Sequence, residues 1–335
     1  MLRVVLIGGG SGISAILRDL KNFQNLEIFS ISTATDDGGS TGKILKIYDD
    51  IIPLGDMRNC LASLAEDKTL ESLFQYRFDR AEFKEHALGN LILLALYHLS
   101  NKDIEEFTNK IHQIFKIKGK AMVSCKKRAT LVAKMENGQI IKGETFINEF
   151  IHKTNLKIEK VFLEGIEDKD VNPLALEAIK KADIIIIGPG SIYSSIIPNF
   201  LVKPLLEEYR KSQALKFYIA NLLNQPNEFL STNLSEYIKI LKTYGIESQW
   251  ILFNNKPIPY ELIKKYKEKD PKYDVLKNDL NKDLNKDLKN EKVIEDDFLC
   301  DNTQNLENSK LIRHSGKKIF NTIKRLVNEK LSKVF

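Results

Sequence analysis

The feature of this chain that most constrains its fold is the amino-terminal stretch, where a short apolar run leads straight into a glycine-rich loop. Residues 2–7 read LRVVLI, which is typical of a strand buried on both faces of a parallel sheet. The next five residues are Gly8, Gly9, Gly10, Ser11 and Gly12. Apolar residues then recur at helical spacing over residues 13–20. This order of strand, loop and helix predicts the first unit of an α/β sheet.

The rest of the chain alternates strand-like and helix-like segments. Residues 120–150 read as short strands around a turn at Glu136, Asn137 and Gly138. We predict the other strands at 26–33, 158–163, 183–187, 216–221 and 248–253, and helices at 57–79, 86–115, 173–182 and 199–212. This alternation predicts an α/β fold with a mostly parallel, doubly wound sheet.

The chain divides into one large domain and a short insert. The length of 335 residues suits a single large domain, which we place at residues 1–275. Residues 276–291 are charged and repeat Asn-Lys-Asp-Leu; we expect a solvated insert, with a partner-binding segment as the alternative. Residues 292–335 are predicted to return to the same domain as a strand and a helix. The helix, at 316–333, is basic and amphipathic, and we expect it to dock on the core and not on a membrane surface.

Composition argues against several classes of protein. The net charge of +6 arises from 51 basic and 45 acidic residues, a mixture that does not predict a nucleic-acid interface. The three cysteines and five histidines show no paired or metal-ligand spacing, so we expect neither a disulfide framework nor a zinc site. No apolar run approaches the roughly 18 residues that span a bilayer, and the start does not read as a signal peptide. We therefore expect a cytoplasmic protein without a membrane span.

The glycine loop carries the clearest chemical signal. Main-chain amides at the start of a helix, unobstructed by side chains, attract phosphate oxygens. The alternative is a tight turn that needs glycine for its positive φ. The loop lacks the GxGxxG spacing, because residue 13 is isoleucine, and it lacks a Walker-type lysine. It therefore predicts a bound phosphate group and favours neither NAD binding nor ATP hydrolysis.

Two further loops carry polar residues after strands. Asp36 and Asp37 follow the second strand, where carboxylates commonly meet a ribose or a hydrated Mg²⁺. An Asx turn with a helix cap is the alternative. Gly190 and Ser191 follow the strand at 183–187, at the sheet edge where open α/β sheets bind ligands. A plain strand-to-helix turn is the alternative there.

Weaker signals lie between these loops. Asp56 reads as the N-cap of a helix and Arg58 as a surface residue, unless Arg58 or Asn59 faces a ligand. Gly89 and Asn90 suggest a close approach of the main chain to a neighbour. No catalytic triad, nucleophile elbow or general base is apparent, so the sequence favours binding over catalysis.

Taken together, the motifs closely resemble those of the YvcK/CofD-like family, and within it the bacterial gluconeogenesis-factor branch. They occur in the family's order: GGGSG at 8–12, ATDDGGSTG at 34–42, PLGDMRNCL at 53–61, LFQYRF at 73–78, HALGNLIL at 86–93 and GPGSIYSSIIPN at 188–199. Asn221, Gln225, Tyr266 and the IRH at 312–314 fit its later segments. The resemblance implies a Rossmann-like three-layer fold. For this branch it also implies binding of UDP-activated sugars such as UDP-N-acetylglucosamine, without an established enzymatic activity. It further implies a role in growth on gluconeogenic carbon sources and in cell shape or cell-wall synthesis.

Carried over by position, the resemblance implies a set of residues that line the ligand cleft: Gly8, Gly9, Gly10, Ser11, Gly12, Asp36, Asp37, Asn59, Gly190 and Ser191. It further implies that Tyr266 stacks on uracil and that Arg313 pairs with the diphosphate, which a planar guanidinium suits. The alternative for both is a surface side chain near a helix. The chain departs from the family after Gln225, where Pro-Asn-Glu-Phe replaces Pro-Gly-Glu-Thr, at Glu236-Tyr237, and at Ser315, where relatives have Asp. These departures bear on the sugar end of the ligand and on any modification near the C-terminus, and they leave the phosphate loops unaltered.

We therefore expect a regulatory protein that binds a UDP-sugar, has no catalytic residues, needs no other cofactor and acts through a protein partner. Self-association is implied by the family alone. The first alternative is a CofD-like 2-phospholactate transferase with a nucleotide-activated donor, in which Asp36 and Asp37 hold Mg²⁺. The second is a scaffold in which the C-terminal helix binds a partner, so that deleting residues 316–335 abolishes function while ligand binding survives.

Overall fold

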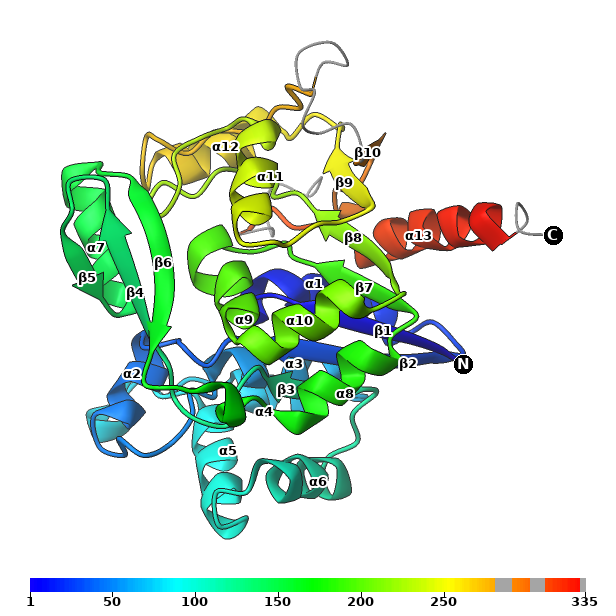
Figure 1. Cartoon of the computed structure of the whole chain (residues 1–335). Helices are drawn as coiled ribbons and strands as arrows, with labels where there is room; N and C mark the ends of the chain where they lie inside the picture. The colour runs from blue at the N-terminus through cyan, green and yellow to red at the C-terminus, as the bar shows by residue number, and fades with distance from the viewer. Residues whose placement is uncertain (281–290, 302–310, 332–335) are drawn as a thin grey trace.

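The computed structural model describes residues 1–280, 291–301 and 311–331. Within these ranges the chain builds a seven-stranded parallel sheet of order β10-β9-β8-β7-β1-β2-β3 (Figure 1). Its strands are β1 (Leu2–Ile7), β2 (Leu26–Ser32), β3 (Lys120–Val123), β7 (Ile184–Ile187), β8 (Leu215–Ile219), β9 (Trp250–Asn254) and β10 (Lys292–Asp296). The expected doubly wound α/β fold is thereby confirmed.

The strand order reverses between β1 and β7. From β1 the chain runs outward through β2 to β3, then returns to β7 and runs outward the other way through β8 and β9 to β10. Crevices for ligands form outside the carboxyl ends of the strands at such a switch point. The loops that leave β1 and β7 there are the glycine loop and the loop at 188–191.

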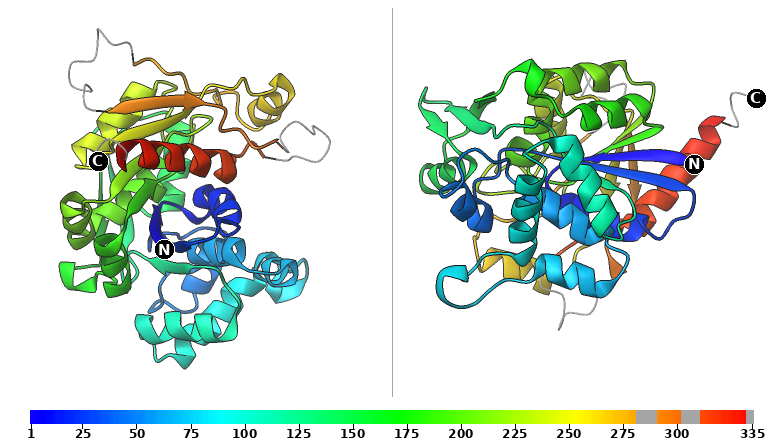
Figure 2. Two further views of the ribbon diagram at one scale, coloured as in Figure 1. Left: turned by 90° about the vertical axis from the view of Figure 1, so that its right-hand side faces the viewer. Right: turned by 90° about the horizontal axis from the view of Figure 1, so that it is seen from below.

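Helices cover both faces of the sheet, which makes three layers. Figures 1 and 2 show α8 (Pro173–Lys181), α9 (Ile197–Leu201) and α10 (Lys203–Lys211) on one face. On the other face lie α1 (Gly10–Leu20), α3 (Gly55–Leu64) and α13 (Gly316–Leu331). In chain order, α11 (Leu234–Thr243) follows β8 and α12 (Tyr260–Lys267) follows β9.

The core is built from the apolar runs that the sequence shows. Val4, Val5 and Leu6 of β1 and the whole of β7 are at most 1% exposed, as expected of strands covered on both faces. In α13 the side chains of Ile319 and Ile323 are fully buried. This helix packs against α1. Within the described ranges, no helix is both long and apolar enough to cross a bilayer.

Three predicted helices are each divided. In the segment 57–79, α3 ends at Leu64 and a second helix, α4 (Lys68–Gln75), begins at Lys68. The Asp67 carboxylate caps α4 by accepting the Leu70 N–H at 2.8 Å. The segment 86–115 divides into α5 (Leu88–Leu99) and α6 (Ile104–Ile114), where two left-handed residues lie at 101 and 102. The segment 199–212 contains a break at Val202, between α9 and α10. Periodicity alone does not show these breaks, since the apolar spacing continues across them.

A small lobe stands beside the main sheet. The predicted hairpin at 136–138 is confirmed, and Gly138 takes a φ of 85° there. It belongs to an antiparallel sheet of β4 (Thr130–Met135), β5 (Ile140–Lys142) and β6 (Ile158–Glu164), packed with α7 (Glu144–Thr154). A short helix α2 (Gly39–Leu45) follows β2. Most of the predicted insert, residues 281–290, lies outside the described residues.

Candidate ligand cleft

A cleft of about 200 Å³ opens at the carboxyl edge of the sheet, at the switch point. It brings together residues that are distant in the chain. The predicted site residues that line it are Ser11, Gly12, Gly190, Ser191, Tyr266 and Arg313. Asn221, Gln225 and His314 line it as well.

The glycines of the first loop are required by close packing between loops. A Cβ on Gly9 would lie 2.4 Å from the Ser195 Oγ, and one on Gly12 would lie 2.1 Å from the Pro189 main-chain oxygen. A Cβ on Gly10 would lie 2.3 Å from the main-chain oxygen of Asp56. Positive φ is found at other glycines, such as Gly188, and the φ of Gly9 is −79°. The interpretation as a turn that needs positive φ is therefore wrong for this loop.

Asp56 meets the amino end of α1. Its carboxylate accepts a hydrogen bond from the Gly10 N–H, while burial and the nearby Asp36 carboxylate raise the pKa of Asp56 to about 7. The prediction that Asp56 is the N-cap of its own helix is wrong, because Leu54 holds that position in α3. Asp56 instead bonds an N–H at the amino terminus of α1, the same terminus that is predicted to bind a phosphate.

Arg58 is buried and bonds the half-buried Asn59. Arg58 is 4% exposed, so the expectation of a surface residue is wrong. Its Nη2 donates to the Asn59 Oδ1 at 2.7 Å, and Gln75 Nε2 donates to the same oxygen at 3.3 Å. Burial lowers the pKa of Arg58 to about 10. Asn59 is thus engaged with its neighbours and is not among the residues that line the cleft.

Gly89 and Asn90 also approach a neighbouring segment, as the sequence suggests. A Cβ on Gly89 would lie 2.6 Å from the main-chain oxygen of Phe74. The Asn90 Nδ2 donates to the Ser40 Oγ at 3.0 Å. Both contacts are internal to the fold.

Asp36 makes the local bond that the Asx-turn alternative describes, whereas Asp37 bonds a distant segment. Asp36 Oδ1 accepts the Gly38 N–H at 3.0 Å, and burial raises the pKa of Asp36. Asp37 Oδ1 accepts two bonds from Thr145 in the first turn of α7, from N at 2.9 Å and from Oγ1 at 2.7 Å. Neither aspartate lines the cleft. Across the part of the chain that the structure describes, no three His, Cys, Asp or Glu side chains are grouped so as to hold a metal ion.

The loop at 188–191 is held by a segment that follows β8. Asn221 bonds both main-chain groups of Gly190, accepting from N at 3.0 Å and donating to O at 2.9 Å. Gln225 Nε2 donates to the Ser191 Oγ at 2.9 Å. The Glu228 carboxylate, 6% exposed, accepts the N–H groups of Tyr193 and Ser194 at 3.1 and 3.0 Å. Sequence reasoning missed Glu228, although it lies in the segment after Gln225 that the motif comparison singled out and there matches the family's glutamate.

Tyr266 and Arg313 come from the other end of the chain. Arg313 Nη1 donates to the Ser11 main-chain oxygen at 3.2 Å. The Ile312 N–H donates to the Tyr266 hydroxyl at 3.2 Å, which fixes the ring against the same segment. The Tyr266 ring also contacts Tyr273 edge to face, with centroids 5.3 Å apart. An aromatic face and a guanidinium thus lie at one cleft beside the α1 terminus.

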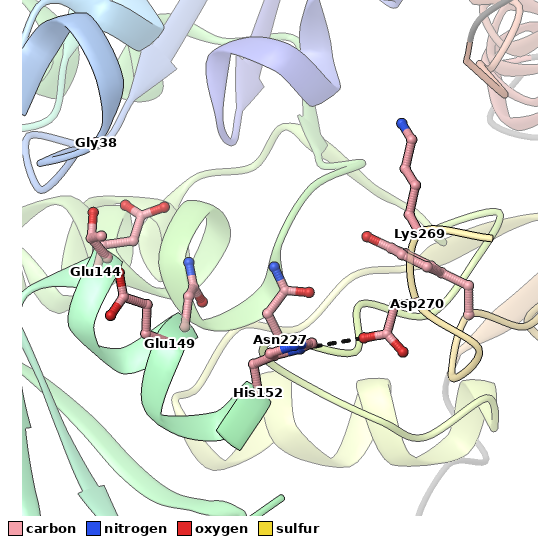
Figure 3. A pocket seen from close by; sticks show the side chains of 10 residues that line it. Gly38, Glu144, Glu149, His152, Asn227, Lys269 and Asp270 are labelled. Atoms are coloured by element: carbon pink, nitrogen blue, oxygen red, sulfur yellow. Dashed lines mark ion pairs between the residues drawn. The ribbon is translucent and has the colours of Figure 1, made fainter. Parts of the chain in front are cut away.

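A second hollow adjoins the cleft and shares Tyr273 with it. Its volume is about 470 Å³, and it lies between α7 and the loop after α12 (Figure 3). Glu144 stands at one end, where burial and the carboxylates of Asp36 and Asp56 raise its pKa well above the usual value. Apart from Gly38, its walls lie outside the motifs of the sequence, because they come from four separate segments: residue 38, α7, residue 227 and residues 269–273.

These features define a Rossmann-like α/β protein with a ligand cleft at the switch point of a doubly wound sheet. A family model described as 2-phospho-L-lactate transferase CofD matches residues 4–299, so the chain belongs to the CofD family, as the motifs predict.

Curated relatives and a solved structure agree with this assignment. A protein of Thermotoga maritima is 35% identical over 327 residues, which cover 97% of this chain and 99% of the relative. The gluconeogenesis factor of Bacillus subtilis is 38% identical over 272 residues, covering 79% of this chain and 82% of that protein. A crystal structure of a UPF0052 family member from Bacillus halodurans has a TM-score of 0.84 at 33% identity, covering 96% of this chain and 99% of that one.

Proposed function

We propose that this protein is a regulatory protein that binds a UDP-sugar, and that it supports growth on gluconeogenic carbon sources and cell-wall synthesis. The name of the Bacillus subtilis relative, gluconeogenesis factor, supports the metabolic part of the proposal. The cleft residues support the ligand. The role in cell shape rests on the family resemblance, and a cytoplasmic location, a regulatory protein partner and self-association belong to the same proposal.

The observation that carries the ligand assignment is the position of Arg313 beside Ser11. A guanidinium and the amino terminus of α1 both favour negative charge, and a guanidinium can donate two parallel hydrogen bonds to a diphosphate. Tyr266, from α12, supplies an aromatic face on the same cleft, which suits a pyrimidine base. A UDP group satisfies both features at once.

Calorimetric titration tests the proposal. The purified chain is titrated with UDP-N-acetylglucosamine, UDP-glucose, GDP and NAD, each with and without Mg²⁺. We expect micromolar binding of a UDP-sugar that is recovered intact afterwards. If no UDP-sugar bound and GDP bound in a Mg²⁺-dependent manner, the result would contradict the proposal and favour the transferase.

The second candidate is a CofD-like transferase, and the description of the matching family model favours it. It would need Mg²⁺ at Asp36 and Asp37. The pair fits a metal poorly as it stands, since Asp37 Oδ1 already accepts two hydrogen bonds from Thr145 and burial favours the neutral form of Asp36. Metal-dependent turnover that disappears in Asp36→Asn would support this candidate.

A further inference from the structure

The hollow between α7 and the loop after α12 contains a buried acceptor that lacks a hydrogen-bond donor. Asp270 is 7% exposed. Its Oδ1 accepts the Lys272 N–H at 2.9 Å, whereas its Oδ2 has no hydrogen-bond partner among the described residues. The His152 Nδ1 lies 3.5 Å from this oxygen, too far for a good hydrogen bond, and forms an ion pair with it only when the ring is protonated (Figure 3). Because an unsatisfied buried carboxylate oxygen is costly, we expect a bound group to supply a donor here.

The other walls of the hollow consist mainly of acceptors and amides, with the Lys269 ammonium beside them. Figure 3 shows Glu144, Glu149 and His152 along α7, with Asn227 between them and Asp270. Three carboxyl groups and one ammonium group, that of Lys269, therefore line one space, so acidic groups outnumber basic ones there and can exchange hydrogen bonds with hydroxyl groups. The amides of Asn148 and Asn227 can both donate and accept. This chemistry suits an uncharged group with several hydroxyls.

The hollow and the cleft differ in charge but are adjacent. Arg313 and the α1 terminus make the cleft favourable for phosphate, and Tyr273 lines both spaces. A ligand with an anionic end and a hydroxylated end can therefore occupy both at once. The volume of about 470 Å³ leaves room for a hexose ring with a substituent and some water.

We propose that this hollow is the sugar subsite, in which Asp270 and Asn148 recognise the hydroxylated ring of a nucleotide sugar whose diphosphate lies at Arg313. This inference rests on the proposed function and deepens it. Asp270 and Asn148 are specificity-determining residues that contact the sugar and leave the nucleotide to the cleft.

The test compares UDP with UDP-glucose and UDP-N-acetylglucosamine by calorimetry, for the full chain and two variants. Asp270→Asn keeps an acceptor for the Lys272 N–H and replaces Oδ2, the oxygen without a hydrogen bond, by a donor. Asn148→Ala removes an amide at a half-buried position of α7. It does not alter the core, so it still tests the subsite if Asp270→Asn fails to fold. Phe146→Ala is the control, because Phe146 is 66% exposed on the same helix and does not line the hollow.

We expect the wild type to bind one UDP-sugar at least about tenfold more tightly than UDP, the effect of one or two hydrogen bonds to charged groups. Asp270→Asn and Asn148→Ala should each lose this advantage while their affinity for UDP stays unchanged, and Phe146→Ala should behave like the wild type. The subsite alone would be overturned if the wild type bound UDP and the UDP-sugars with equal affinity. It would also be overturned if the variants kept the preference for the UDP-sugar, or if they lost UDP binding as well. Absence of binding by UDP and both UDP-sugars to the wild type would overturn the proposed function, and the subsite with it.

Discussion

The Arg313 guanidinium donates a hydrogen bond from Nη1 to the main-chain oxygen of Ser11, at 3.2 Å and across 302 positions of the chain. The last described segment of the protein is thereby bonded to its first loop. Because α13 begins three residues after Arg313 and packs on α1, the segment that carries the guanidinium is fixed to α1 at a second place. Ligand binding and the docking of the C-terminal segment are therefore expected to be linked.

Arg313→Ala should weaken binding of the UDP-sugar by about tenfold to a hundredfold, the usual effect of losing hydrogen bonds to a charged group. Arg313→Lys should recover part of the affinity, because lysine keeps the charge and loses the planar fork. Calorimetric titration measures both, with the exposed Lys317→Ala as control. Unchanged affinity in Arg313→Ala would exclude the assigned role.

Gly12→Ala should destabilise the fold by about 1–3 kcal/mol, the typical cost of overpacking. The new Cβ would lie 2.1 Å from the Pro189 main-chain oxygen, so the two ligand loops would have to separate. Gly38→Ala is the matched control, since a Cβ there would meet its nearest neighbour at 3.6 Å. Urea denaturation compares the two, and equal midpoints would show that the loops do not need this contact.

Glu228→Gln should lower both stability and UDP-sugar affinity. The amide has one acceptor oxygen, so one of the N–H groups of Tyr193 and Ser194 loses its bond, at a cost of about 1–3 kcal/mol. Glu236→Gln, at an exposed position, serves as control in the same denaturation and titration experiments. If affinity alone stayed at the wild-type level, Glu228 would be structural and would not position the ligand loop.

Asp56 should make stability fall as pH rises from about 4 to 7. Its pKa is raised to about 7 in the folded state, so the native protein binds more protons than the unfolded chain in this window. Asp56→Asn removes this effect, so its free energy of unfolding relative to the wild type should rise across the window and level off above pH 7. The rise should not exceed about 4 kcal/mol, at about 1.4 kcal/mol per pKa unit.

Urea denaturation at a series of pH values measures this difference for Asp56→Asn. The same substitution at the exposed Asp79 is the control and should change stability little at any pH. A difference that is constant from pH 4 to 8 for Asp56→Asn would show that Asp56 titrates in the folded protein as it does in the unfolded chain.

Ile323→Ala should cost about 2–5 kcal/mol, the range for truncating a buried isoleucine. Ile323 is fully buried in α13, whereas Asn321 on the same helix is exposed and provides the control substitution. Thermal unfolding checks the difference. For the same reason, deletion of residues 316–335 should unfold the protein, so it cannot separate a scaffold function from ligand binding. A folded, ligand-binding deletion variant would contradict this expectation.

Local features of the sequence were sufficient to predict much of the fold. The strands at 2–7 and 183–187 are recognisable because burial on both faces requires unbroken apolar runs. The hairpin at 136–138 follows from the tolerance of glycine for positive φ. The helices at 57–79 and 86–115 were predicted as single because a cap such as Asp67 interrupts the helix without changing the apolar spacing.

What the sequence by itself determined is the set of elements and the loops that end at the carboxyl edge of the sheet, since both follow from short-range patterns. Only the tertiary structure decided which side chains meet there. Asp56 faces Gly10, Glu228 holds the turn at 193–194, and Arg313 reaches Ser11, because β1 lies next to β7 and the chain end returns to α1. Such contacts join distant residues, and only packing, which no local pattern records, selects the partner of a buried polar group.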